Sequence, residues 1–294
     1  MEKKYYEGVD GLNIPYLEFT SKRGDMKKNI IIIHGMTEHV YRYEEFSEFL
    51  SSNGYNIFVL EYRGHGELKV SKYGDFGKLG MNGIVDDIKK FIDEKFQLEK
   101  PIIIGHSMGA EIAQKIIIDE QIKYYILSGQ SYKTSMLIIF GKIISRLEIM
   151  SLFMKKSILN KVFTKYNKLF KPNKTSADWL TRDEKEAEKF VNDKLCGFAV
   201  TPRFYNELFK LMSYTKKNIN QTKEDVEALL IFGSKDPASK FGKEQKKYSK
   251  KLKNKKRKIK ILKNEDGRHE SLNEINKYQI YDEMLQWLND SVVE

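Results

Sequence analysis

One serine of this chain stands in a sequence setting that can turn its hydroxyl into a nucleophile. The pentapeptide Gly105-His106-Ser107-Met108-Gly109 has the pattern G-x-S-x-G and lies between the apolar run 101–105 and the amphipathic stretch 108–120. A strand, a tight turn and a helix in this order form a nucleophile elbow, with glycines where a Cβ would clash. The motif therefore predicts Ser107 as a catalytic nucleophile. The alternative is an idle serine in a glycine-lined turn.

A serine hydroxyl attacks well only when a base takes its proton, and the chain offers His34, His39, His65, His106 and His269 for this role. We expect His106, inside the elbow, to pack structurally. His34 and His65 stand in His-Gly pairs at strand ends, where their rings should bond backbone, and His39 should cap or lie on the first helix. His269 falls in the polar loop NEDGRHESLNE before the last helix, where a base can reach the sheet edge. We therefore predict His269 as the base.

The histidine needs an acid that orients it, on a strand end between the serine and the histidine in chain order. Asp236, in LLIFGSKDPAS, follows the apolar run 227–233 and meets this requirement. Its carboxylate would hold the histidine tautomer and stabilise the imidazolium that forms. A turn-forming Asp-Pro pair is the alternative reading of Asp236. Glu265 and Asp266 are the other candidates for the acid, although they lie very near His269 in the sequence.

The tetrahedral oxyanion of acyl transfer needs two preorganised N–H donors. We expect one from Met108, directly after the nucleophile, and one from Met36 in the loop IIIHGMTEH, where Gly35 permits a sharp turn. Both methionine side chains can also line an acyl pocket, with plain packing as the alternative.

The spacing of the relevant residues does not fit the sequence motifs of zinc or nucleotide binding. His269-Glu270 lacks the second histidine of the zinc motif H-E-x-x-H, and the glycine-lysine pairs lack the rest of a P-loop. No metal or nucleotide cofactor is expected. The single cysteine, Cys196, cannot form an internal disulfide, so we interpret it as a small buried hydrophobe in a chain of the reducing cytoplasm.

The elements that must position these residues are visible as short β-branched runs separated by amphipathic stretches. Such runs without polar alternation are typical of parallel strands buried on both faces, joined by right-handed βαβ crossovers. An Asp-Gly turn within residues 5–20 predicts an antiparallel hairpin at the sheet edge. The expected strands are 29–34, 56–61, 101–105, 124–128, 227–233 and 258–262, and the expected helices are 43–52, 83–96, 108–120, 240–252 and 271–288.

The alternation of apolar runs and amphipathic stretches stops after Gly129 and returns at Val226. The interval reads as helical, with a break at 171–176, so we predict a helical cap at 131–220 inserted between core segments 1–130 and 221–294. The cap carries 18 Lys and Arg against 8 Asp and Glu. No helix-turn-helix, zinc-finger spacing or RNP-like strand accompanies this charge, so we do not expect nucleic acid as the partner.

Residues 131–174 combine ten Lys and Arg with a single acid, Glu148. An apolar face flanked by lysines is the composition of an interfacial helix, so we predict a lid that contacts anionic membrane at the inner surface. The alternative is a cap helix packed on the core with its lysines in water. The run 136–144 is too short to span a bilayer, and the first residues lack the features of a signal peptide. The apolar residues concerned are Met136, Leu137, Ile138, Ile139, Phe140, Ile143, Ile144, Leu147, Ile149, Met150, Leu152, Phe153, Met154, Val162, Phe163 and Phe170.

Five motifs, IIIHGM, EYRGHGE, IIIGHSMGAE, IFGSKDP and GRHESLNE, follow one another in an order and spacing that resemble the α/β-hydrolase family. Within it the chain is most similar to the monoacylglycerol lipase and lysophospholipase group. The resemblance covers nearly the whole chain. It implies an α/β-hydrolase fold, with a mostly parallel eight-stranded sheet, helices on both faces and an inserted helical cap.

The resemblance also implies roles for five residues and a substrate class. Ser107 would be the nucleophile, His269 the base and Asp236 the acid, with Met36 and Met108 as oxyanion donors. The substrate would be a lipid-like carboxylic ester, a monoacylglycerol or lysophospholipid. A thioesterase, a general carboxylesterase and a non-catalytic lipid or protein binder are the alternatives, and acyl length, head group and oligomeric state stay open. The sequence departs from the family pattern at Glu61, Glu67, Ala110 and Asp193-Lys194.

Overall fold

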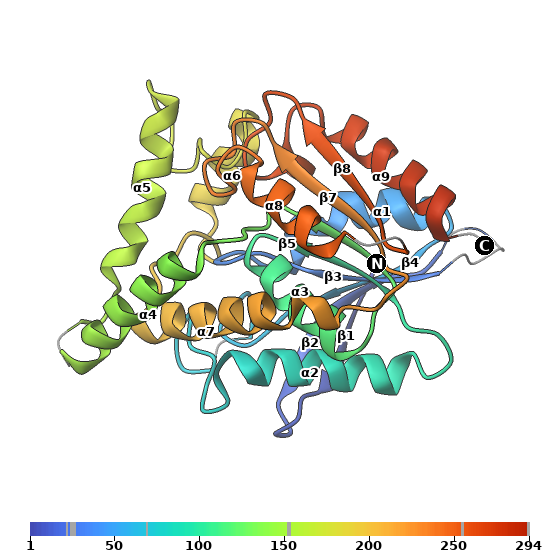
Figure 1. Cartoon of the computed structure of the whole chain (residues 1–294), viewed down its shortest axis with the longest axis horizontal. Coiled ribbons are helices and arrows are strands. Elements are labelled where there is room, and N and C mark those ends of the chain that lie inside the picture. Colours follow the sequence, from blue (N-terminus) through green and yellow to red (C-terminus); the bar gives the residue numbers. More distant parts are fainter. Residues whose placement is uncertain (22, 24–27, 69, 152–153, 254–255, 293–294) are drawn as a thin grey trace.

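An eight-stranded sheet forms the centre of the molecule in a computed structural model (Figure 1). The structure describes the chain except residues 22, 24–27, 69, 152–153, 254–255 and 293–294. The strand order is β1-β2-β4-β3-β5-β6-β7-β8, with β1 and β2 antiparallel at one edge and parallel pairing from β4 to β8. The strands are β1 Glu2–Glu7, β2 Asn13–Phe19, β3 Asn29–Ile33, β4 Asn56–Leu60, β5 Ile102–His106, β6 Tyr124–Ser128, β7 Glu227–Gly233 and β8 Lys258–Asn264.

The apolar runs form strands because both of their faces are buried. In β3, Ile31 and Ile33 belong to one hydrophobic cluster, whereas Ile30 and Ile32 belong to another on the opposite face. Successive strand side chains point to opposite faces, so a run without polar residues fits only a sheet that is covered on both sides. The predicted fold class and the edge hairpin are confirmed.

Helices cover both faces of the sheet. One cluster joins the sheet to α2 (Gly80–Lys95), α3 (Met108–Asp119) and α8 (Lys243–Leu252), and the other joins it to α1 (Glu44–Ser52) and α9 (Lys277–Val292). The last helix begins six residues later than predicted, because the chain first makes a short 3-10 turn. The 3-10 turns are Val40–Tyr43, Ile158–Asn160, Lys168–Phe170, Ile219–Gln221 and Ser271–Asn273.

The segment between β6 and β7 contains α4 (Ser135–Met150), α5 (Lys161–Asn167), α6 (Glu184–Asn192) and α7 (Pro202–Asn218). Helices α4, α5 and α6 lie toward the left end of the molecule in Figure 1. Helix α7 packs against α4, α3 and α2, and its apolar side chains belong to the same cluster as those of the core helices. Part of the inserted segment therefore packs as a core helix; the boundaries at 131 and 220 stay predictions.

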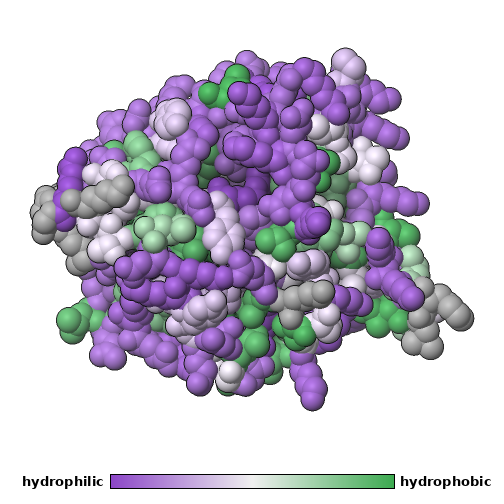
Figure 2. Space-filling view, turned by 180° about the vertical axis from the view of Figure 1, so that it is seen from behind, coloured by the Kyte–Doolittle hydropathy of each residue, from purple (hydrophilic) through white to green (hydrophobic). Residues whose placement is uncertain are grey.

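Helix α4 buries a narrow stripe of mixed polarity and exposes most of its large apolar residues. Its buried residues are Ile138, Gly141, Ser145 and Glu148, which lie in one stripe against α7 and the chain that follows α4. Apolar side chains gather at the right of Figure 2, where this helix lies in the view from behind. Its exposed large apolar residues are Met136, Leu137, Ile139, Phe140, Ile143, Leu147, Ile149 and Met150.

Leu152 and Phe153, which the sequence adds to the same apolar face, lie outside the described residues. Within the described part of the chain, every helix is too short or too polar to cross a membrane.

Candidate active site

The turn between β5 and α3 holds Ser107 in a strained backbone conformation. Its φ of 51° and ψ of −115° are values that an L-residue rarely adopts. The turn closes tightly, because a Cβ on Gly105 would lie 2.7 Å from the backbone oxygen of Gly109, and a Cβ on Gly109 would collide with the carbonyls of Ile33 and His34. The sequence motif thus has the strand, turn and helix that a nucleophile elbow requires.

The structure brings Ser107, His269 and Asp236 together from three distant parts of the chain. The Nε2 atom of His269 lies 2.9 Å from the Ser107 hydroxyl oxygen, and its Nδ1 atom lies 3.1 Å from Oδ1 of Asp236. The distance from Nδ1 to Oδ1 of Asp236 is short enough for a hydrogen bond, but the ring N–H is not aligned with this oxygen. Such bonds are often poorly aligned until substrate is present. Both His269 and Asp236 are almost completely buried, with 3% and 0% of their surface exposed.

Burial and charge act in opposite directions on this pair. Burial alone would lower the pKa of His269, but the adjacent carboxylate of Asp236, with those of Glu270 and Glu38, raises that pKa above its usual value. Burial alone would raise the pKa of Asp236, whereas His269 and bonds from Ser239 and the Ala238 amide lower it. Asp236 therefore stays an anion and favours a protonated His269.

The two other candidates for the acid lie at the surface. The side chains of Glu265 and Asp266 are 66% and 62% exposed, and they pair with Lys263 and Lys235. Neither is placed beside His269, so Asp236 is the carboxylate that the fold delivers to the ring.

The loop after β3 presents a free amide to the space beside Ser107. Met36 and Met108 both line this space, and among the described residues no protein acceptor meets the backbone N–H of either. Thr37, the next residue of the loop, has a positive φ of 57°. Both amides therefore lie beside Ser107, unbonded by the described residues, and their role as oxyanion donors stays a prediction.

A buried ionic network holds this loop beside the loop of His269. The guanidinium of Arg42 donates to Oε2 of Glu38 at 2.6 Å and to both oxygens of Glu270 at 2.8 and 2.6 Å. Glu38 also accepts the backbone N–H of Gly35, directly before Met36. Burial opposes charge on both carboxyls, but Arg42 lowers the pKa of each, so both stay ionised. The cation therefore links the oxyanion loop to the residue after His269.

Sequence reasoning missed this network. Glu38 and Arg42 are four residues apart, which is a signal for an ion pair on a helical turn. The third member, Glu270, lies 228 residues from Arg42, so only the fold reveals the pairing.

The remaining histidines of the site region have mostly structural contacts. Nδ1 of His34 lies 2.9 Å from the Gly35 carbonyl, and Nδ1 of His65 lies 3.3 Å from the Arg63 carbonyl, as predicted. Nε2 of His34 in addition lies 2.6 Å from a Glu61 oxygen, which gives this departure from the family pattern a structural role. His106 is buried, and its ring centre lies 5.1 Å from that of His269.

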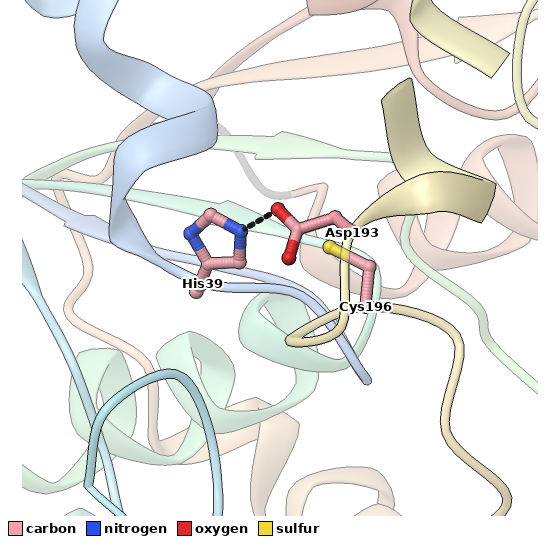
Figure 3. A group of neighbouring side chains, drawn as sticks. All are labelled: His39, Asp193 and Cys196. Atoms are coloured by element: carbon pink, nitrogen blue, oxygen red, sulfur yellow. Dashed lines mark hydrogen bonds and ion pairs between the residues drawn. The ribbon is translucent and has the colours of Figure 1, made fainter. Parts of the chain in front are cut away.

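His39 is the N-cap residue of the 3-10 turn Val40–Tyr43 that leads into α1, as expected, but its side chain makes no capping hydrogen bond. Its Nε2 lies 2.7 Å from Oδ2 of Asp193, in the chain that follows α6, and buried Cys196 lies beside them (Figure 3). In the part of the chain that the structure describes, these three side chains are the group that could hold a metal ion. Burial raises the pKa of Cys196 well above its usual range, which opposes the thiolate that a metal needs. The contact therefore serves to tie the oxyanion loop to the inserted segment.

Two cavities meet at Ser107, and Met36, Phe163 and His269 line both. One, of about 880 Å³, is the more polar of the two and is called the polar cavity below: its wall combines aromatic and aliphatic side chains such as Trp179 and Phe198 with Thr37, Asn160, Thr164, Ser176 and Glu270. The other, of about 810 Å³, runs between α3, α5 and α7 and is mostly apolar, with Leu159, Val162, Tyr205, Leu208, Phe209 and Met212 in its wall. Ser107 can thus reach a substrate with one apolar part and one polar part.

A comparison with known proteins agrees with this geometry. A family model described as serine aminopeptidase, S33 (Hydrolase_4) matches residues 24–276. The chain belongs to this family. It is thereby an α/β hydrolase, and the resemblance drawn from its motifs is confirmed.

Curated relatives of this α/β hydrolase include proteins named as lipases. Phospholipase YtpA of Bacillus subtilis is 27% identical over 183 residues, which cover 62% of this chain and 65% of the relative. The probable lysophospholipase L2 of Haemophilus influenzae is 24% identical over 136 residues, covering 44% of this chain and 43% of the relative. The matched stretches thus span less than two thirds of these relatives.

Solved structures show the same fold over the whole chain. A carboxyl esterase from Bacillus coagulans in complex with glycerol has a TM-score of 0.87 at 18% identity, covering 100% of this chain and 99% of that one. A monoglyceride lipase variant from Saccharomyces cerevisiae with a substrate analog has a TM-score of 0.77 at 18% identity, covering 100% and 95%. At these identities the likeness establishes the fold alone.

Proposed function

We propose that this α/β hydrolase cleaves carboxylic esters of lipid-like substrates through an acyl-enzyme, with Ser107, His269 and Asp236 as its catalytic triad. The observation that carries the proposal is the line from the Ser107 hydroxyl through the two nitrogens of His269 to Asp236, at the point where the two cavities meet. No cofactor is needed for this reaction, because the triad supplies nucleophile, base and acid.

The reaction follows from the positions of these groups. Nε2 of neutral His269 takes the Ser107 proton while the serine oxygen bonds to the ester carbonyl carbon. The carbonyl oxygen becomes an anion that the amides of Met36 and Met108 stabilise. The imidazolium, held by Asp236, then gives its proton to the alcohol oxygen as the C–O bond breaks. Water repeats both steps on the acyl-enzyme and regenerates the serine.

The two cavities indicate how a lipid-like ester would lie. We assign the acyl chain to the apolar cavity, because its burial among Leu208, Phe209 and Met212 removes apolar surface from water. We assign the alcohol part to the polar cavity, where hydroxyl and amide groups can bond it. A monoacylglycerol or a lysophospholipid combines these two parts, in keeping with the names of the relatives.

Labelling with a fluorophosphonate tests the proposal. We expect covalent labelling of the folded protein, its loss in Ser107→Ala, and ester hydrolysis that fails in the same variant. A folded wild-type protein that takes no label would overturn the enzyme proposal and leave the binding-protein alternative. A panel of monoacylglycerols, lysophospholipids and thioesters of different acyl length would then identify the substrate.

Amides are a less favourable substrate than esters in this site. A peptidase that removes N-terminal residues needs a free carboxylate for the substrate ammonium, and the cavity does contain Glu38 and Glu270. Both are already paired with Arg42, which neutralises much of their charge. This pairing favours an uncharged alcohol over an amino group in the polar cavity.

We also propose that the protein contacts anionic membrane, at the cytoplasmic surface, through helix α4 and the basic chain that follows it. A helix normally buries its apolar side, whereas α4 leaves Met136 and Met150 67% and 75% exposed. The stripe it buries includes two polar residues that are bonded within the protein: Ser145 accepts from Asn206 at 3.1 Å, and Glu148 accepts from Ser157 at 2.6 Å. These bonds hold the apolar side outward, where an acyl-chain layer can cover it.

The charge beside α4 makes a lipid surface the fitting occupant. Lys155, Lys156, Lys161 and Lys165 are exposed, and Glu148, the only acid of 131–174, is buried within the protein. Each basic residue near an anionic leaflet contributes about 1 kcal/mol, and salt screens this term. Insertion of the apolar side of α4 and attraction of the neighbouring lysines thus both favour an anionic lipid surface.

Co-sedimentation of Ser107→Ala protein with vesicles tests the membrane contact. We expect binding to vesicles that contain phosphatidylserine, weaker binding in added salt and in a variant with Lys155, Lys156, Lys161 and Lys165 changed to glutamine, and little binding to phosphatidylcholine alone. Equal binding to both vesicles, or none, would contradict the proposal and leave α4 as an ordinary helix of the inserted segment packed on α7.

A further inference from the structure

A buried carboxyl group stands in the apolar cavity and has no part in the triad. Glu111 lies four residues after Ser107 on α3, so its side chain is on the same side of the helix as the serine. It lines the apolar cavity beside Met108 and Met212, and it is only 3% exposed. An acyl chain that leaves Ser107 along this cavity must pass this group.

Only one oxygen of Glu111 is satisfied by the protein. Oε1 accepts the backbone N–H of Ser131 at 3.1 Å and its hydroxyl at 3.0 Å. Among the described residues, no donor bonds Oε2. A cation that acts on Glu111, Lys133, is engaged elsewhere: its ammonium lies 3.1 Å from Glu244 and donates to the Ala238 carbonyl at 2.6 Å. A hydrogen-bond acceptor is therefore left free in a mostly apolar wall.

A carboxyl group in this position is costly unless a ligand bonds to it. Burial raises the pKa of Glu111 to about 7; the Ser131 bonds and Lys133 oppose this rise, and the charge of Glu244 adds to it. Plain alkyl chains offer no donor, so they would leave the group unsatisfied and desolvated. An acyl chain that carries a hydroxyl would satisfy it.

We propose that Glu111 is a specificity-determining residue whose free oxygen accepts a hydrogen bond from a hydroxyl on the acyl chain, so that hydroxyacyl esters are preferred over plain acyl esters of equal length. This inference rests on the ester hydrolase function proposed for Ser107. Four residues of helix rise by about 6 Å, so the hydroxyl belongs near the ester carbonyl and not at the far end of the chain. The β-hydroxyacyl ester is the class that fits.

The test compares two p-nitrophenyl esters, β-hydroxyoctanoate and octanoate. In wild type we expect kcat/KM to be higher for the hydroxylated ester. In Glu111→Leu we expect the ratio of the two values to fall about tenfold or more, since a site built to bond a hydroxyl discriminates strongly against its absence. Glu111→Gln keeps an acceptor oxygen of the same reach and should keep most of the preference.

A purely structural role for Glu111 would act differently. Ser131→Ala removes a partner of Oε1 and leaves Oε2 in place, so it should change both esters by the same factor. The ratio in wild type should also rise with pH through about 7, as Glu111 ionises and becomes a stronger acceptor in the field of Lys133 and Glu244. In Glu111→Gln the ratio should not respond to pH in this range.

An equal ratio in wild type and Glu111→Leu would overturn the proposal, as would a wild-type preference for plain octanoate at every pH. Failure of the proposed function is distinguishable, because it would abolish hydrolysis of p-nitrophenyl acetate and fluorophosphonate labelling. The acetyl group, and a fluorophosphonate that carries only a methyl or ethyl substituent, are too short to depend on Glu111.

Discussion

The sheet edge at Ser107 and the helix α4 of the inserted segment both reverse the usual placement of side chains: the first buries charged residues, and the second exposes apolar ones. At the sheet edge, Arg42, Glu38 and Glu270 are buried as ions, each at most 9% exposed in its side chain. In α4, large apolar side chains such as Leu147 and Ile139 are 61% and 55% exposed. Buried ions are compensated by one another, whereas the apolar face of α4 is not covered by any of the described residues. The first region is therefore complete in itself, and the second is the surface for which we propose a membrane partner.

The largest expected effect is a loss of catalysis at the sheet edge without a matching loss of stability. Asp236→Asn keeps the shape of the side chain but removes the charge that orients His269. We expect kcat for an ester to fall by something like 10⁴-fold. The midpoint temperature of thermal unfolding should change little by comparison. Turnover near that of wild type would contradict the role of Asp236 and transfer the acid to another carboxylate.

The second prediction concerns the cost of breaking the buried network. Arg42→Gln leaves Glu38 and Glu270 buried without their cation, so we expect a loss of about 3–5 kcal/mol in the free energy of unfolding, measured in urea. The matched control is Lys174→Gln in the inserted segment, whose exposed bridge to Glu184 should contribute about 1 kcal/mol or less. Equal losses of unfolding free energy in Arg42→Gln and Lys174→Gln would show that the buried network is no more important for stability than the exposed ion pair.

The third prediction compares one substitution in both regions. Ile104→Ala removes a side chain that is 1% exposed in β5, and we expect it to cost about 2–5 kcal/mol of unfolding free energy. Ile139→Ala removes the same atoms from the exposed side of α4 and should change stability by no more than about 0.5 kcal/mol. The same variant should weaken vesicle binding. A large loss of stability in Ile139→Ala would show that α4 is covered within the protein.

The smallest effect is a shift along the pH axis. The base must be neutral, and the net influence of its surroundings raises the pKa of His269, so more alkaline conditions are needed to free it. The rate of fluorophosphonate labelling should therefore rise with pH about a midpoint above the ordinary histidine value of about 6.5. The sequence alone gives no reason to depart from that value. A midpoint at or below it would indicate that burial outweighs Asp236.

Much of the fold was predictable because its signals are local. Six β-branched runs, each within a few residues of the observed strand, and the G-x-S-x-G motif between a strand and a helix depend on neighbours in the chain. His269 and Asp236 were predictable as candidates because each follows a strand at the sheet edge. The direction of α4 was not predictable, because an amphipathic pattern does not say which of its sides finds a protein partner.

The sequence by itself determined the alternation of strands and helices, the position of the nucleophile turn and the candidates for base and acid, because these depend on side-chain period, turn residues and chain order. The tertiary structure alone decided that Asp236 and not Glu265 or Asp266 meets His269, that Arg42 joins two loops 228 residues apart, and that Glu111 enters the apolar cavity. The physical reason is that ion pairing, burial and pKa depend on distances in space, which residues remote in sequence acquire only when the chain has packed.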